Sequence, residues 1–258
     1  PENLIDINVR TDYSKLKYLV HNNNRLNGNF DVLKSLFAQN YILVDTIKDS
    51  FSSYELPKQE NFISLLYYLG LVTIDKVEFG DIRLIIPNQT IRVIMAEFLN
   101  SMLVDTNTLE LDLREFHQGM IQLAINDDLG VIEYLAKILD ETSSIRDLVS
   151  QESDIKMFYM TYFSLNRLYA SISEIELNKG YSDILLLKAP NIKDEIPNIL
   201  IEFKFFKQKQ KVSDELLQQT IEQAKEQIGR YRQSSKFGID RSVVVIFQGF
   251  RLLYCEWV

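Results

Sequence analysis

The residues best suited to chemistry are two acids and a lysine in the second half of the chain: Asp183, Glu202 and Lys204. Asp183 interrupts the apolar run 181–188, and Glu202 and Lys204 lie two positions apart in the apolar run 198–206. Because side chains alternate along a strand, Glu202 and Lys204 point to one side and their apolar neighbours to the other. Charges in such apolar strands need each other, a metal ion or a water-filled cleft.

Two carboxylates on neighbouring strands form a natural site for Mg²⁺ or Mn²⁺. A bound divalent ion lowers the pKa of a water molecule and polarises a phosphoryl oxygen. A neighbouring lysine orients the attacking water and offsets the charge that develops in the transition state. Phosphodiester hydrolysis needs little more from a protein. The competing interpretation is structural, with Glu202 and Lys204 as an ion pair and Asp183 as an acid that caps a turn.

The segment after the second strand, 212–234, has the spacing of a long amphipathic helix. Gln227 and Tyr231 lie four residues apart on the edge of its apolar stripe, where they face the rim of a cleft or simply the solvent. From Leu200 to Lys236 there are eight Lys and Arg residues and five acids, a balance of 8 − 5 = +3. This local excess of positive charge indicates either an ordinary solvated helix face or a surface that faces phosphates.

The composition excludes several other chemistries. The 258 residues carry a net charge of −8, which argues against a surface that binds nucleic acid everywhere. One cysteine and two histidines are too few for the usual zinc sites, and no phosphate-binding or dinucleotide-binding glycine motif is present. No membrane span or secretory signal is recognisable, so we expect a cytoplasmic protein. The chain begins at Pro1, and we expect a fragment or a processed chain.

Mixed α/β structure must position these residues. We expect strands over 171–177, 181–188, 198–206, 241–248 and 250–258, and helices over 155–169 and 212–234. The helix over 155–169 precedes the first strand, and the helix over 212–234 lies between the third and fourth strands. This order predicts a mixed sheet flanked by helices.

The first half of the chain has a different pattern. We expect helices over 12–20, 31–37, 60–69 and 90–103, a strand over 41–44, and a hairpin of 71–79 and 82–86 divided by Gly80-Asp81. Helices followed by a hairpin resemble a winged-helix unit, which serves as a binding wing or as a packing module. A polar linker over 105–113 and a helix over 116–139, broken at 127–130, lead into the second half.

Three segments together resemble the PD-(D/E)XK nuclease superfamily: Gly180-Tyr181-Ser182-Asp183, Ile201-Glu202-Phe203-Lys204, and Gln227-Ile228-Gly229-Arg230-Tyr231. The last is similar to the Q-x-x-x-Y motif of its RecB-like members. The wider pattern, including 64–70 and 86–88, is similar to a bacterial group in which an AAA-ATPase-like domain precedes the nuclease domain.

The resemblance implies a restriction-endonuclease-like domain over 111–258. Residues 1–110 would then be a helical, winged-helix-like tail of an ATPase-like region whose nucleotide-binding core is missing. It implies Asp183 and Glu202 as metal ligands, Lys204 as the catalytic lysine, and Gln227 and Tyr231 as site residues borne on a helix. The expected cofactor is Mg²⁺ or Mn²⁺, and the expected partner is nucleic acid, DNA before RNA.

The chain departs from the family where an arginine commonly precedes the Asp, since Tyr181-Ser182 stands there. A further acid is also common, and Glu152, Asp154 and Glu174 are equal candidates for it, so one metal or two stays open. Three functions remain: an active nuclease, a nuclease-like fold that binds nucleic acid or protein without cutting, and an appendage of an ATPase. Homo-oligomer formation and the identity of any protein partner also stay open.

Overall fold

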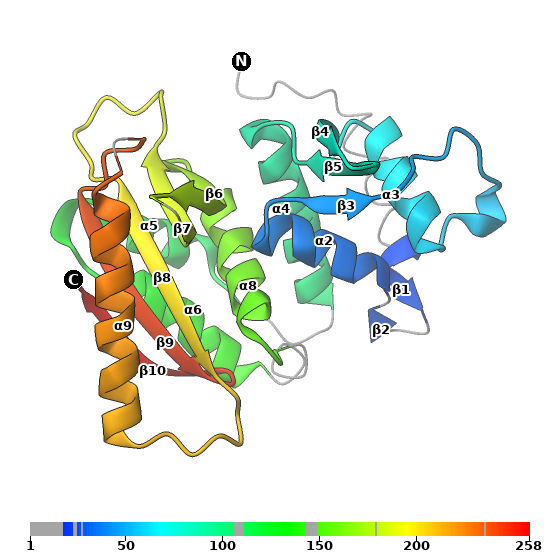
Figure 1. Ribbon diagram of the computed structural model, residues 1–258. Helices are drawn as coiled ribbons and strands as arrows, with labels where there is room; N and C mark the ends of the chain where they lie inside the picture. The colour runs from blue at the N-terminus through cyan, green and yellow to red at the C-terminus, as the bar shows by residue number, and fades with distance from the viewer. Residues whose placement is uncertain are drawn as a thin grey trace. The chain divides into compact units, whose positions relative to one another are not determined.

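The computed structural model describes residues 18–22, 25–26, 28–105, 111–142, 149–178, 180–234 and 236–258. The chain divides into two compact units, Pro1–Met102 and Leu103–Val258 (Figure 1). Most of the predicted helix 12–20 and residues 106–110 of the predicted linker lie outside the described residues, so the predicted domain boundary after residue 110 stays a prediction. No helix among the described residues is long and apolar enough to cross a membrane.

The first unit combines helices with a three-stranded antiparallel sheet of order β3-β5-β4. Its elements are β1 (His21–Asn22), β2 (Arg25–Leu26), α2 (Gly28–Ala38), β3 (Ile42–Val44), the 3₁₀ helix η1 (Ser53–Glu55), α3 (Gln59–Tyr68), β4 (Thr73–Glu78), β5 (Asp81–Ile85) and α4 (Gln89–Asp105). The predicted hairpin is confirmed as β4–β5, but Asp81 begins β5 rather than forming the turn. Phe79 and Gly80 make the turn with φ of 54° and 97°, the positive values that a tight two-residue hairpin requires.

The second unit is a five-stranded sheet of order β10-β9-β8-β7-β6, in which only the β8–β9 pair is parallel. Its elements are α5 (Leu113–Asn126), α6 (Gly130–Glu141), α8 (Glu152–Leu165), β6 (Tyr169–Leu177), β7 (Gly180–Lys188), β8 (Ile199–Phe206), α9 (Asp214–Arg232), β9 (Arg241–Gln248) and β10 (Arg251–Trp257). The predicted α/β class, with a mixed sheet flanked by helices, is therefore confirmed.

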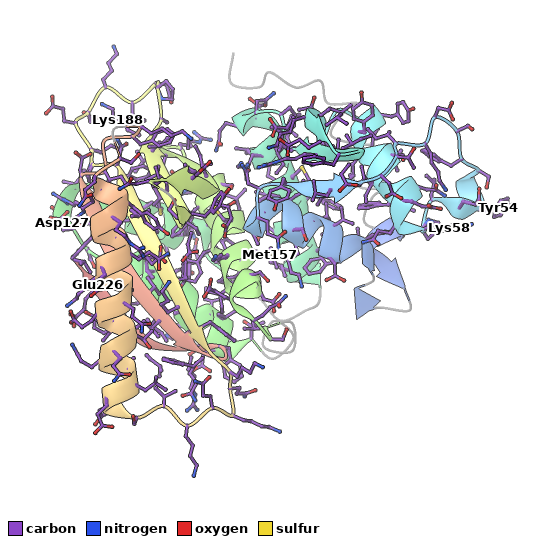
Figure 2. The ribbon with its side chains drawn as sticks, in the orientation of Figure 1. Tyr54, Lys58, Asp127, Met157, Lys188 and Glu226 are labelled. Carbon is purple, nitrogen blue, oxygen red and sulfur yellow. The ribbon has the colours of Figure 1, made fainter. Side chains whose placement is uncertain are left out.

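Helices cover both faces of this sheet. On one face, α9 packs through Ile221, Ala224 and Ile228 against side chains of β8 and β9 that include Leu200 and Val244. Figure 1 shows α9 lying in front of these two strands. The exposed Glu226 marks the solvent side of α9 in Figure 2.

The opposite face is covered by α8, which the pattern of aromatic contacts makes clear. The ring of Tyr159 lies 5.1 Å from that of Phe203 and 6.0 Å from that of Phe247, centroid to centroid. Phe203 and Phe247 are buried on β8 and β9. Because side chains alternate along β8, Phe203 faces α8 while Glu202 and Lys204 face the α9 side. The apolar face predicted for β8 thus packs against α8, and the predicted charged face lies toward α9.

One helix boundary was wrong. The prediction placed a helix over 155–169, whereas α8 runs from Glu152 to Leu165. Asn166 ends it, because its side-chain oxygen accepts hydrogen bonds from the backbone N–H of Leu168 and Tyr169, at 2.8 and 2.7 Å. These bonds turn the chain into β6. The apolar residues after Asn166 therefore belong to the strand, not to the helix.

Candidate active site

Strands β7 and β8 separate where Asp183 and Glu202 face each other. Their pairing runs from Leu186 opposite Ile199 to Ile184 opposite Ile201 and stops there. Beyond this point the backbone N–H of Phe203 donates to Asp183 Oδ2 at 2.7 Å. A side-chain carboxylate thus takes the place of a backbone acceptor. Asp183 and Glu202 are buried at the opening between the two strands, with 5% and 0% of their surface exposed.

Lys204 lies beside Glu202, as the alternation along the strand predicts. Its Nζ lies 2.7 Å from Glu202 Oε1 and donates to Gln227 Oε1 at 3.0 Å. The Lys204 side chain keeps 24% of its surface exposed, whereas that of Glu202 is fully buried. The ammonium group therefore stands between a buried acid and the solvent, held from two sides.

Gln227 and Tyr231 continue the same hydrogen-bond chain from α9. Gln227 Nε2 donates to the hydroxyl oxygen of Tyr231 at 2.5 Å, and that hydroxyl donates to the backbone carbonyl of Tyr181 at 2.7 Å. The start of β7 lies close against this ring, since a Cβ on Gly180 would come within 2.8 Å of Tyr231 Cε1. One continuous chain of hydrogen bonds thus joins β7, α9 and Lys204 of β8.

A second lysine, which the sequence reasoning missed, lies on the other side of Asp183. Lys156 of α8 forms ion pairs with Asp183 Oδ1, with Glu174 Oε1 at 2.9 Å and with Glu152 Oε1 at 3.0 Å. Only 9% of its side chain is exposed. Two signals pointed to it: a lysine inside a strongly apolar helix, and Glu152 four residues before it on the same helix face.

The three further acids left open by the sequence have different surroundings. Asp154 Oδ2 accepts hydrogen bonds from the backbone N–H of Ser150 and Gln151 at 2.8 and 3.0 Å, which caps the start of α8. Glu152 and Glu174 instead face Lys156. Glu174 stands opposite Asp183 in the β6–β7 register, between the pairs Ser173–Ile184 and Ile175–Ser182.

Burial dominates the electrostatics of the two central acids. Burial, together with the nearby Asp183 carboxylate, raises the pKa of Glu202 to about 8, although the Lys204 ammonium opposes this shift. Burial likewise raises the pKa of Asp183 to about 6, although the Lys156 ammonium opposes this shift. Burial alone would lower the pKa of Lys156, yet the carboxylates of Asp183, Glu152 and Glu174 raise it overall. Burial thus outweighs the two lysines that contact Asp183 and Glu202, and a bound cation would stabilise the ionised form of both acids.

The donor atoms suit a hard divalent ion at Asp183 and Glu202. Glu202 Oε2 is buried and has no hydrogen-bond partner among the residues that the structure describes. A buried carboxylate oxygen without a partner is costly, and a metal ion would supply one. Within the described residues, no three acids, histidines or cysteines are grouped closely enough to hold a metal by themselves. The fit therefore rests on two carboxylates, with water or substrate oxygens as the remaining ligands.

The comparisons with known proteins support the interpretation of the second half of the chain. Residues 150–257 match the family described as the PD-(D/E)XK nuclease superfamily. The predicted resemblance is thus confirmed for that segment, and nucleases of this superfamily typically use divalent metal ions. No match supports the predicted ATPase-like character of residues 1–110. Neither the curated proteins nor the solved structures include a match to this chain.

Proposed function

We propose that the second unit is a divalent-metal-dependent nuclease that hydrolyses phosphodiester bonds of DNA or RNA. One observation carries the proposal: Asp183, Glu202 and Lys204 meet at the point where β7 and β8 separate, and one oxygen of Glu202 has no partner there. Buried charged groups of this kind are retained at a cost to stability, which a catalytic role accounts for.

Asp183 and Glu202 would hold the metal ion, Mg²⁺ or Mn²⁺. When bound, such an ion lowers the pKa of a water molecule and polarises a phosphoryl oxygen. Lys204 directs a positive charge and N–H donors toward the same place, where they offset negative charge on the reacting phosphate. Its pairing with Glu202 keeps the ammonium group at the opening of the site.

Gln227 and Tyr231 act as positioning residues in this proposal. Gln227 accepts a hydrogen bond from Lys204 and donates one to Tyr231, whose hydroxyl is in turn fixed on the Tyr181 carbonyl. Since the lysine side chain has many rotamers, these contacts reduce the freedom of its ammonium group before substrate binds. Neither residue needs to touch the substrate for this role.

The loop after β8 supplies positive charge for the nucleic-acid backbone. Lys207, Lys209 and Lys211 are exposed on it. Gln248 Nε2 holds the loop by donating to the backbone carbonyls of Gln208 and Gln210, at 3.4 and 2.6 Å. Three exposed lysines on an anchored loop suit contacts to phosphates, in a chain whose net charge is −8.

One observation favours a second function, a nuclease-like fold that binds nucleic acid or protein without cutting. Asp183 Oδ1 already has a partner in Lys156, and Asp183 Oδ2 has one in the Phe203 N–H. An acid satisfied on both oxygens has less need of a metal ion. Cleavage assays separate this function from the first, because only an active nuclease depends on both metal and Lys204.

The test is cleavage of supercoiled plasmid and of single-stranded DNA and RNA, with Mn²⁺, Mg²⁺ or a chelator. We expect metal-dependent cleavage, and a loss of about 10²-fold or more in Asp183→Asn and in Lys204→Met. Lys225→Met is the matched control, since Lys225 is a partly exposed lysine of α9 whose ion pair is with Glu222. Circular dichroism and thermal unfolding check that each variant folds.

Two results would contradict the proposal. Cleavage that persists unchanged in both Asp183→Asn and Lys204→Met would come from a contaminant. Nucleic-acid binding without cleavage in any metal, by folded wild-type protein, would leave the non-cutting binding module as the function.

A further inference from the structure

The ammonium group of Lys156 occupies a position that three carboxylates surround. Oxygens of Glu152, Glu174 and Asp183 all converge on Nζ, the first two at 3.0 and 2.9 Å. They come from three elements, α8, β6 and β7. Three acids at one point repel each other strongly unless a cation lies between them. Lys156 is that cation, and it is carried by the chain itself.

This position is separate from that of the proposed metal ion but shares Asp183 with it. Glu202 lies on the far side of Asp183, across the separation of β7 and β8, and its unpartnered oxygen is available to a metal. A carboxylate oxygen has more than one lone pair, so Asp183 can serve the ammonium and a metal ion together. Asp183 thus stands between two cation positions, and a lysine fills one.

The charges agree with a single divalent ion. When ionised, the carboxylates of Glu152, Glu174, Asp183 and Glu202 face two ammonium groups, those of Lys156 and Lys204. Four negative and two positive charges leave −2, which one divalent ion neutralises. A second divalent ion beside Lys156 would meet a positive charge in a buried site.

We propose that Lys156 is the resident second cation of this site, so that the protein binds one divalent metal ion where the same acids without Lys156 would bind two. This inference rests on the proposed metal site at Asp183 and Glu202. It assigns Glu152 and Glu174 to the lysine rather than to a metal. It also predicts that a variant without the Lys156 ammonium gains a second metal ion, because its removal exposes three carboxylates of the type that hard cations prefer.

A second metal could replace the ammonium once the three acids move closer together, because among the described residues their present spacing does not by itself form a metal site. Carboxylate oxygens lie about 2.0–2.6 Å from Mg²⁺ or Ca²⁺, compared with the 2.9 and 3.0 Å measured here to Nζ. The acids would therefore close in by roughly 0.3–1 Å. Glu152 and Glu174 keep 38% and 25% of their side chains exposed, so both can make this movement.

The experiment counts Mn²⁺ bound to the purified full chain by equilibrium dialysis, with free Mn²⁺ measured by electron paramagnetic resonance. We expect one ion per chain for wild type and two for Lys156→Met, which keeps the length of the side chain and loses its charge. Lys156→Arg retains the charge and should bind one ion. Lys225→Met, which removes a partly exposed lysine of α9 whose ion pair is with Glu222, is the matched control and should also bind one.

Stability provides a second readout that does not depend on activity. Without metal, Lys156→Met leaves three uncompensated acids, so its Tm should fall below that of wild type. Added Mn²⁺ should then raise the Tm of Lys156→Met more than that of wild type, because two ions bind to the folded state instead of one.

Several outcomes would overturn the inference. Two ions on the wild type, or one ion on folded Lys156→Met, would each do so. If Lys156→Met does not fold, Glu152→Gln provides the test. One bound Mn²⁺ ion in that variant, as in wild type, supports the pairing of Glu152 with Lys156. Fewer bound ions would identify Glu152 as a metal ligand. One Mn²⁺ ion on wild type and two on Lys156→Met, without cleavage by the wild type, would support this inference and refute the proposed nuclease. No bound Mn²⁺ on the wild type would refute both.

Discussion

Gly180→Ala tests the contact that joins α9 to the start of β7. A Cβ at this position would lie 2.8 Å from Tyr231 Cε1, 3.0 Å from its hydroxyl oxygen and 3.4 Å from Cζ. Contacts under 3.0 Å are not tolerated, so the ring or the strand must move. Tyr231 is buried, with 3% of its surface exposed, and its hydroxyl is fixed by Gln227 and Tyr181. The ring therefore has little room to move aside.

The cost follows from these contacts. Overpacking a buried site costs about 1–3 kcal/mol, and a lost hydrogen bond between Tyr231 and Tyr181 adds about 0.5–1.5 kcal/mol. Each kcal/mol lowers the Tm of a unit this size by roughly 2–4 °C. Because Tyr231 holds Gln227 and Gln227 holds Lys204, we also expect weaker cleavage, expressed as a lower kcat.

Gly229→Ala is the matched control for this substitution. Gly229 lies within α9, and a Cβ there would meet nothing within 4 Å. An alanine in a helix interior is favoured over glycine by about 0.5–1 kcal/mol, so this variant should be more stable than wild type. Thermal unfolding of both variants decides the matter. A Gly180→Ala protein as stable as wild type would refute the close approach of β7 to Tyr231.

Two further predictions concern acids of the same unit. The pKa of Glu202 is raised to about 8 in the folded protein from an ordinary 4.5, so the folded state holds a proton more tightly than the unfolded chain. The stability of the metal-free protein should therefore fall as pH rises from about 5 through 8, and Glu202→Gln should flatten that slope in denaturant titrations at several pH values. Asp154→Ala should cost about 1–2 kcal/mol through loss of the α8 cap, while equilibrium dialysis should still find the wild-type number of Mn²⁺ ions. A lower Mn²⁺ count in that variant would mean that Asp154 is a ligand.

Local geometry explains what could be predicted from the sequence. The two-residue period of a strand placed Glu202 and Lys204 on one side of β8, and their ion pair follows from that spacing. The 3.6-residue period of a helix placed Gln227 and Tyr231 one turn apart, close enough for their hydrogen bond. These relations depend only on neighbours along the chain, and so do the order of the elements and the α/β class.

Tertiary packing decided the rest of the site. Asp183 meets Glu202 only because β7 pairs with β8, and the opening between them exists because that pairing stops at Ile184 and Ile201. Lys156 reaches Asp183 from a helix 27 positions earlier in the sequence, since α8 docks against the sheet. The sequence alone thus determined which charged side chains share a face of one element. Which charges from different elements come within 3 Å of each other was set by the docking of helices on the sheet, because that distance depends on the packing of the whole core.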